Sequence, residues 1–345
     1  MVTTIGIDPH KATHTAVAID DAEDVLGELT VSADRSQTDR LVEWADNLNG
    51  QSSRIWAVEA AGGLGYLLSQ QLVACGEQVV DVPAVLASRV RVLGSGRSDK
   101  NDPNDARSVA IAALRQPGLA RVRREDQVQV LRMVAKRHRE LTSLRTQAVC
   151  RLHAVLMQLR PGGIPRRLSA KRATRMLQGM RSLDAVGEQR RAMARTHLGD
   201  IRRLDRDIAA NKTRIRQAVA AADTTMTDVF GVGPIVAAFL IGYTGDPLRF
   251  ASPDHYAAYN GTAPIEVSSG GKTRHRLSRR GNRTLNHAIH MAAVTQIRFD
   301  TPGRVYYDKK QGEGKTRKEA LRALKRRISN AVYRRLVADQ QRATS

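Results

Sequence analysis

The chain has 345 residues, and its 56 Lys and Arg against 34 Asp and Glu give a formal net charge of +22 at pH 7. A hydrophobic content of 41% excludes wholesale disorder, and the length suggests about two domains. The two cysteines exclude a disulfide framework and a Cys-based zinc site, and no apolar run approaches the roughly 18 residues of a membrane span.

The first third of the chain alternates strand and helix signals. Residues 3–8, 14–20 and 26–32 are predicted as strands whose short connections favour an antiparallel meander. Further strands are expected at 54–59 and 78–82, and helices at 36–49, 64–75, 84–93 and 103–115. This order predicts an α/β domain with a mixed five-stranded sheet covered by helices.

The middle of the chain carries almost no strand signal. A helical pattern rich in Leu, Arg and Gln covers residues 126–159, breaks at PGGIP, and resumes over about 181–222. The pattern predicts two long antiparallel helices, which could also pair between chains as a coiled coil.

From residue 228 onward the remaining signals are mainly helical. FGVGPIVAAFLIGYTGD reads as helix, tight glycine turn and helix, and a polar loop over about 260–282 follows. Helices are then expected near 283–298 and over about 315–340. We therefore expect three domains, at 1–120, 121–225 and 226–345.

Charge is distributed unevenly between these regions. Residues 1–120 hold 10 Lys and Arg against 16 Asp and Glu, whereas residues 121–345 hold 46 against 18. The basic region is expected to neutralise nucleic acid phosphates. The alternative is a solvated or membrane-surface basic face, but little amphipathic Trp or Phe accompanies the charge.

Four carboxylates stand where they could converge. Asp8 and Glu59 end predicted strands, and Asp102 and Asp105 lie at i and i+3 on one face of a predicted helix. Such oxygen ligands suit Mg²⁺ or Mn²⁺, two of which could clamp the oxygens of a phosphodiester. The structural alternatives are a turn at Asp8, a helix cap at Asp102 followed by proline, and a helix-dipole role for Asp105.

A serine-containing segment lies in the basic region. In YNGTAPIEVSSGGKTRHRLSRRGN, Ser268 and Ser269 precede two glycines and a run of cations. A serine on a flexible glycine turn could attack a phosphodiester if a base or a metal activated it. An ordinary polar loop is the alternative, as is a helical core hairpin for the preceding glycine segment.

Other candidate sites are weak. His287 and His290 lack a third ligand for zinc, and His10 and His14 are expected to face solvent. No Walker-type loop or dinucleotide fingerprint occurs, so no use of ATP or nicotinamide is expected.

The motifs GIDPHK, AVE and KNDPNDA resemble the four-carboxylate signature of the DEDD insertion-sequence transposases. The later segment, with Gly261, Pro264, a Ser-Gly pair and the SRRG element, resembles the second conserved domain of the same family. The resemblance spans nearly the whole chain. It implies a RuvC-like first domain with a ribonuclease H fold, a helical linker and a serine domain.

The resemblance also assigns roles to residues. It makes Asp8, Glu59, Asp102 and Asp105 ligands of Mg²⁺ or Mn²⁺. It makes Ser269, rather than Ser268, the nucleophile. The residues expected to contact nucleic acid are Lys11, Lys272, Arg274, Arg276, Arg279 and Arg280. The chain departs from the family pattern at Ala61, where Ser or Thr is usual, and at Asn286, where Arg is usual.

The expected function is that of an insertion-sequence transposase, a DNA recombinase that cuts and rejoins DNA through a phosphoserine link. The resemblance implies a homo-oligomer, as a dimer or as a tetramer in the synaptic complex. It also implies an element-encoded bridge RNA and a bacterial cytoplasmic, nucleoid-associated location without membrane contact. The alternatives are a metal-dependent nuclease resembling junction resolvases and a non-catalytic nucleic-acid-binding regulator.

Overall fold

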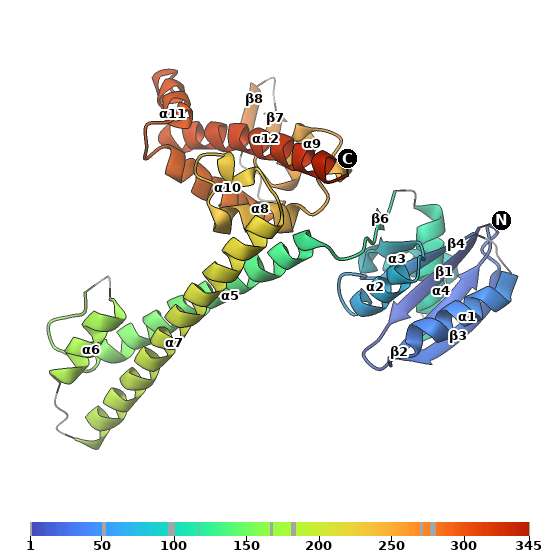
Figure 1. The fold of residues 1–345 in the computed structure, drawn as a ribbon, viewed down its shortest axis with the longest axis horizontal. Coiled ribbons are helices and arrows are strands. Elements are labelled where there is room, and N and C mark those ends of the chain that lie inside the picture. The colour runs from blue at the N-terminus through green and yellow to red at the C-terminus, as the bar shows by residue number, and fades with distance from the viewer. Residues whose placement is uncertain are drawn as a thin grey trace. The chain divides into compact units, whose positions relative to one another are not determined.

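The computed structural model describes residues 2–49, 53–95, 101–116, 118–165, 168–180, 184–269, 272–276 and 281–344. The chain forms two compact units, Met1–Glu125 (unit 1) and Asp126–Ser345 (unit 2) (Figure 1). Unit 1 contains a sheet with helices, and unit 2 is mainly helical. Within the described ranges, every helix is too short or too polar to cross a membrane.

Unit 1 is built on a six-stranded sheet with the order β3-β2-β1-β4-β5-β6. The strands are β1 Thr3–Pro9, β2 Thr13–Ile19, β3 Val25–Ser32, β4 Arg54–Glu59, β5 Val79–Val82 and β6 Ala120–Arg121. Strands β1, β2 and β3 form the predicted antiparallel meander, and β1, β4 and β5 run parallel. The prediction of five strands is wrong because β6, with two residues, is too short to give a periodic signal.

Helices cover both faces of this sheet. They are α1 Gln37–Asn49, α2 Tyr66–Ala74, α3 Ala84–Ser95 and α4 Asp102–Arg115. Ile5 and Trp56 pack with α1 and α2, whereas Ala57 packs with α3 and α4. Because side chains alternate along a strand, Asp8 of β1 and Glu59 of β4 point toward the face covered by α3 and α4.

Unit 2 begins with a long antiparallel helix pair, visible side by side in Figure 1. Its helices are α5 Gln127–Met157, α6 Ala170–Gln178 and α7 Ala185–Ala221. Gln127 Nε2 donates to the carbonyl of Ala218 at 2.8 Å, and Asn211 Nδ2 donates to the carbonyl of Val134 at 3.0 Å. The predicted antiparallel pair is therefore formed within one chain, whereas α6 was not predicted because it is only nine residues long.

The remaining helices of unit 2 surround a second apolar core. They are α8 Pro234–Thr244, α9 Pro253–Tyr259, α10 Arg283–Gln296, α11 Pro302–Gly312 and α12 Arg317–Thr344, with 3₁₀ turns η1 Met226–Asp228 and η2 Pro247–Arg249. Tyr256 of α9, Leu285 of α10 and Ala320 of α12 are fully buried in this core. The predicted helices near 283–298 and 315–340 are confirmed, but α9 and α11 were missed.

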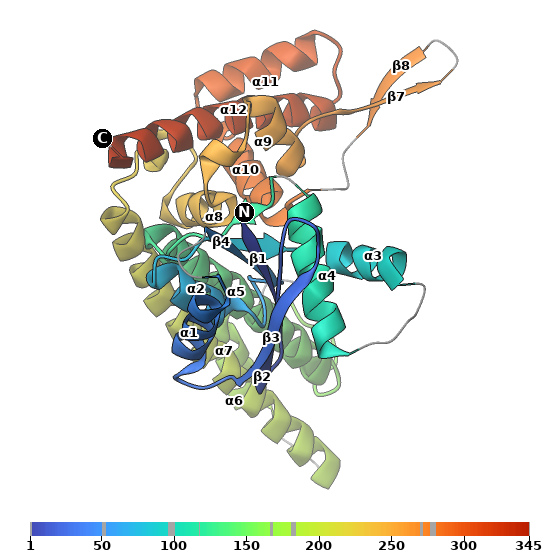
Figure 2. The same cartoon turned by 90° about the vertical axis from the view of Figure 1, so that its right-hand side faces the viewer.

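A β-hairpin replaces a stretch of the predicted polar loop at 260–282. Strands β7 Ile265–Ser269 and β8 Lys272–Arg276 pair antiparallel, with Ile265 opposite Arg276. Figure 2 shows this hairpin extending away from the helices of unit 2. The loop prediction is wrong here because two short alternating segments flanking two glycines are a hairpin pattern, which the dense cations obscured.

The predicted helix before the glycine turn at 231 is also wrong. After α7 ends, the chain forms only the 3₁₀ turn η1 before α8 begins at Pro234. Gly231 has φ +85°, and a Cβ at this position would lie 2.7 Å from the carbonyl oxygen of Ala292. The glycine therefore allows the turn to pack against α10, which supports the structural alternative for this segment.

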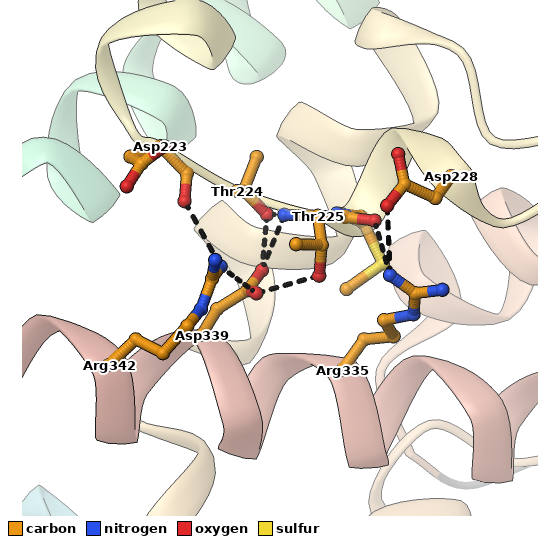
Figure 3. A network of polar contacts seen from close by, with 8 residues as sticks. Asp223, Thr224, Thr225, Asp228, Arg335, Asp339 and Arg342 are labelled. Carbon is orange, nitrogen blue, oxygen red and sulfur yellow. Dashed lines mark hydrogen bonds and ion pairs between the residues drawn. The ribbon is translucent and has the colours of Figure 1, made fainter.

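Asp339 ties the end of α12 to the segment after α7 (Figure 3). Thr224 Oγ1 and Thr225 Oγ1 donate to its carboxylate at 2.6 and 2.7 Å, and the backbone N–H of Thr225 donates at 3.0 Å. Burial alone would raise the pKa of Asp339, but these hydrogen bonds and one from Arg342 outweigh it and hold the pKa below its ordinary value.

We expect Asp339→Asn to lower the free energy of unfolding by about 1–2 kcal/mol at neutral pH, because it removes a charged acceptor. A depressed carboxyl pKa stabilises the fold above the unfolded-state pKa and loses that effect as pH falls through the folded-state pKa. Thermal unfolding temperatures of variant and wild type should therefore converge in acid. If the unfolding temperatures still differ in acid, the stabilisation does not come from the ionised carboxylate of Asp339.

Candidate active site

Asp8 and Glu59 lie next to each other because β1 and β4 are parallel neighbours. Ile7 pairs with Val58, so the next residue of each strand reaches the same edge of the sheet. The side chain of Asp8 is only 11% exposed, and a hydrogen bond joins its carboxyl group to that of Glu59. Two ionised carboxyl groups this close repel each other, so the pair favours a proton or a cation.

A close approach of α4 to β1 brings two further aspartates to this edge. A Cβ on Gly6 would lie 2.1 Å from the carbonyl oxygen of Ala106, so only glycine permits the contact. Asp105 directly precedes Ala106, and Asp102 lies about one turn earlier. Asp8, His10 and Asp102 each offer one possible ligand atom, and these atoms lie within 4.8 Å of one another.

Asp102 does not cap α4, so its carboxylate is available to this cluster. Asn101 is the N-cap, and its side chain accepts a hydrogen bond from the backbone N–H of Asn104 at 2.9 Å. The alternative prediction that Asp102 caps the helix is therefore wrong. Pro103 occupies the second helical position, where its missing N–H costs no intrahelical hydrogen bond.

The charges of the cluster are only partly balanced. Burial and the carboxylates of Asp8 and Asp105 raise the pKa of Glu59. Arg91 of α3 forms an ion pair with Asp105 and partly offsets this effect. A divalent cation would remove the remaining repulsion, and the oxygen-rich donor set suits a hard ion.

The turn after Glu59 is fixed through its backbone. The N–H of Ala60 donates to the carbonyl of Val82 at 3.0 Å, and the N–H of Ala61 donates to Asp81 Oδ1 at 2.8 Å. Ala61, where the chain departs from the family pattern, is 4% exposed and packs in the core. The position of Glu59 therefore does not depend on a hydroxyl side chain at 61.

Two residues of the cluster were missed as site residues from the sequence. His10 is exposed as expected, but its Nδ1 lies 3.8 Å from the carboxylate of Asp8. Arg91 is the other, and its helix carried no motif. A basic or imidazole residue two positions after a strand-end aspartate is the signal that could have identified His10.

The expectation that His14 faces solvent is wrong. His14 is 4% exposed, and its Nε2 is 3.0 Å from Oε1 of Gln37. Burial lowers its pKa. Its place in β2, a strand covered by helices, explains the error because every inward position of a covered strand is buried.

The residues of the basic segment belong to unit 2, and the carboxylates belong to unit 1. Ser269 ends β7 and pairs with Lys272 of β8. Lys11 is exposed in the connection between β1 and β2. The side chains of Ser268, Ser269, Lys272, Arg274 and Arg276 fall outside the described residues, and Arg279 and Arg280 lie wholly outside them.

Comparisons with known proteins match both units to transposases. Residues 5–161 match the DEDD-type IS110 family model, described as transposase, and residues 223–308 match the model described as transposase IS116/IS110/IS902 family. Together the two matches cover more than half of the chain.

Two relatives are similar to the chain over nearly its full length, and a third over about seven tenths of it. It is 28% identical over 375 aligned positions to the insertion element IS116 uncharacterized 44.8 kDa protein of Streptomyces clavuligerus, covering 95% of the chain and 93% of that protein. It is 27% identical over 377 positions to the insertion element IS900 uncharacterized 42 kDa protein of Mycobacterium paratuberculosis, and the alignment covers 95% of the chain and 94% of that protein. A putative transposase of Sinorhizobium fredii is 26% identical over 255 positions, which are 72% of the chain and 63% of that protein.

The Gly6 contact gives a direct test of how the site is assembled. We expect Gly6→Ala to destabilise unit 1 by about 3 kcal/mol, because the new methyl group meets helix backbone and forces α4 away from β1. The same displacement should weaken divalent-cation binding. Chemical denaturation and isothermal titration with Mn²⁺ would measure the two effects. Wild-type stability in Gly6→Ala would show that α4 does not depend on this contact.

Mg²⁺ or Mn²⁺ should raise the unfolding temperature of the wild-type chain, with a stabilisation of about 2.7 kcal/mol at 100 times the dissociation constant. Asp8→Asn and Asp102→Asn should each remove most of this effect, because each removes one anionic ligand. Asp21→Asn, at an exposed position of the same unit, is the matched control. Equal temperature shifts in all four proteins would place the cation elsewhere.

Proposed function

Since the chain belongs to the IS116/IS110/IS902 family of transposases, we propose that it cuts and rejoins DNA at the ends of an insertion element through a serine nucleophile. The observation that carries this proposal is the contact between Asp8 and Glu59 at the edge of the sheet, with Asp102 and Asp105 delivered by α4. We further propose that unit 1 is RuvC-like with a ribonuclease H fold.

Asp8, Glu59, Asp102 and Asp105 would hold Mg²⁺ or Mn²⁺, in keeping with the general use of divalent ions by DEDD transposases. When bound, such ions stabilise negative charge on the oxygens of a reacting phosphodiester. Arg91 keeps Asp105 ordered through its ion pair. His10, exposed beside Asp8, is placed to hydrogen-bond a phosphate oxygen.

The proposed chemistry is a pair of transesterifications at Ser269. Its hydroxyl oxygen attacks phosphorus, the bond from phosphorus to the leaving DNA oxygen breaks, and the serine proton passes through a base to that oxygen. A hydroxyl of another strand then attacks the phosphoserine and restores the serine. Each step exchanges one ester bond for another, so the reaction needs no ATP.

The basic residues of the serine segment would stabilise the extra negative charge of these steps. These are Lys272, Arg274, Arg276, Arg279 and Arg280, with Lys11, exposed between β1 and β2, as a further contact to DNA. The excess of 46 Lys and Arg over 18 Asp and Glu in residues 121–345 supports binding of DNA and of a bridge RNA.

The proposed mechanism uses residues of both units. We propose three functional regions: a catalytic region of residues 1–120, a helical linker of residues 121–225 able to form a coiled coil between chains, and a serine region of residues 226–345. The chain would act as a homo-oligomer, a dimer or a tetramer in the synaptic complex, in the bacterial cytoplasm near the nucleoid. One chain's carboxylates would then meet another chain's serine.

A hydrolytic nuclease is the second candidate function. It is favoured by the fact that the carboxylate cluster forms entirely from residues of unit 1, without the serine segment. The regulator alternative loses the helix cap that it assigned to Asp102, because Asn101 caps α4.

Ser269→Ala separates the two candidates. We expect it to abolish strand joining and the covalent protein–DNA adduct detected by denaturing gel with labelled DNA, because no hydroxyl remains to form the ester. Ser268→Ala, on the neighbouring residue, should retain both. Efficient joining by Ser269→Ala would contradict the serine mechanism and point to another nucleophile. Cleavage by Ser269→Ala, with neither joining nor a covalent adduct in the wild type, would support the hydrolytic nuclease.

A further inference from the structure

Helix α12 carries a lysine whose ammonium is largely withdrawn from water. Lys325 is only 9% exposed, and its Nζ donates to Asn286 Oδ1 at 2.6 Å. Among the residues of unit 2 that the structure describes, no carboxylate forms an ion pair with it, and Asn286 is the one acceptor for its three N–H donors. A buried charge without a counter-charge is costly, so this site favours an anion.

The groups around this ammonium are neutral or cationic. Arg283, Asn286 and His290 lie at i, i+3 and i+7 of α10, on one face of that helix, and α10 packs against α12. Burial and the Arg283 guanidinium lower the pKa of Lys325 to about 8, so it is still protonated near neutral pH. Burial and the charge of Lys325 also lower the pKa of His290.

A buried polar network holds this arrangement in place. Asn286 Nδ2 donates to the carbonyls of Asn260 and Gly261 at 2.9 and 3.0 Å, which directs its Oδ1 toward Lys325. Asn260 Nδ2 donates to Ser329 Oγ at 2.8 Å, and both of these residues are fully buried. The ammonium is therefore positioned before any ligand arrives, which lowers the cost of binding.

The network also lies at the base of the β7–β8 hairpin. Asn260 and Gly261 precede β7, and the N–H of Asn282, which follows β8, donates to the carbonyl of Tyr259 at 2.7 Å. A group bound by Lys325 would thus lie where the hairpin bearing Ser269 leaves the helical core.

We propose that Lys325, Arg283 and His290 form a phosphate-binding subsite that takes a phosphodiester group of a nucleic acid strand. A phosphate oxygen supplies the acceptors that the ammonium lacks, and charge-assisted bonds of this kind are strong. The nature of the ligand as nucleic acid rests on the proposed function. The competing interpretation is that Lys325 only stabilises the turn at Asn260 and Gly261, through its hydrogen bond to Asn286.

Inorganic phosphate is the first probe, with the full chain in metal-free buffer. Phosphate should raise the unfolding temperature of the wild type, Lys325→Met should lose this shift, and Lys325→Arg should keep it. Lys318→Met, at an exposed lysine of the same helix, removes the same charge and should behave as wild type. An equal shift in Lys325→Met and wild type would overturn the proposal.

Duplex DNA is the second probe, measured by fluorescence anisotropy without metal. Lys325→Met should weaken binding about tenfold, the order expected for one buried charge-assisted phosphate contact. Lys318→Met should change it less than about twofold, since exposed charges are screened. A phosphate shift without any effect of Lys325→Met on DNA binding would make the ligand a free phosphate and overturn the nucleic acid assignment.

If Lys325→Met does not fold, a third variant tests the proposal. Arg283 is exposed, so Arg283→Gln should fold normally and reduce both the phosphate shift and the DNA affinity. Unchanged binding in Arg283→Gln would then overturn the proposal. Neither probe requires strand joining, so a chain that binds phosphate through Lys325 but never forms a phosphoserine would contradict the proposed function alone.

Discussion

The packing of α4 directly on β1 at Gly6 is the contact on which the candidate active site depends. The strand edge alone brings Asp8 to Glu59, because neighbouring parallel strands end together. The other two carboxylates come from a helix far along the chain, and they reach this edge only because Gly6 lets the backbone of Ala106 approach.

Two charge clusters of opposite sign, each with a buried charged residue, occur in the two units. In unit 1, burial and like charges raise the pKa of Glu59, and Arg91 compensates only a fraction of the repulsion. In unit 2, Lys325 is buried beside Arg283. The first environment favours a cation and the second favours an anion. A nucleic acid phosphate with its divalent ions satisfies both requirements, which is why the two clusters fit one proposed activity.

The errors of prediction have physical causes. Strand β6 and helix α6 are short, and periodic patterns need several residues to be recognised. The hairpin of β7 and β8 was read as a loop because cations dominated the segment, although its alternation around two glycines favoured strands. Gly231 was expected in a turn between two helices, whereas the short 3₁₀ turn η1 precedes it and its neighbour in the structure is the backbone of Ala292.

The sequence by itself determined the meander of unit 1 and the antiparallel helices of unit 2, and it identified four carboxylates as candidates for metal binding. These follow from local periodicity and from the chemistry of side chains at strand and helix ends. Only the tertiary structure decided that Asn101 caps α4, that His10 and Arg91 join the carboxylates, and that Lys325 lies buried against Asn286. Such contacts join residues distant in sequence, and no local pattern encodes the closeness of packing that creates them.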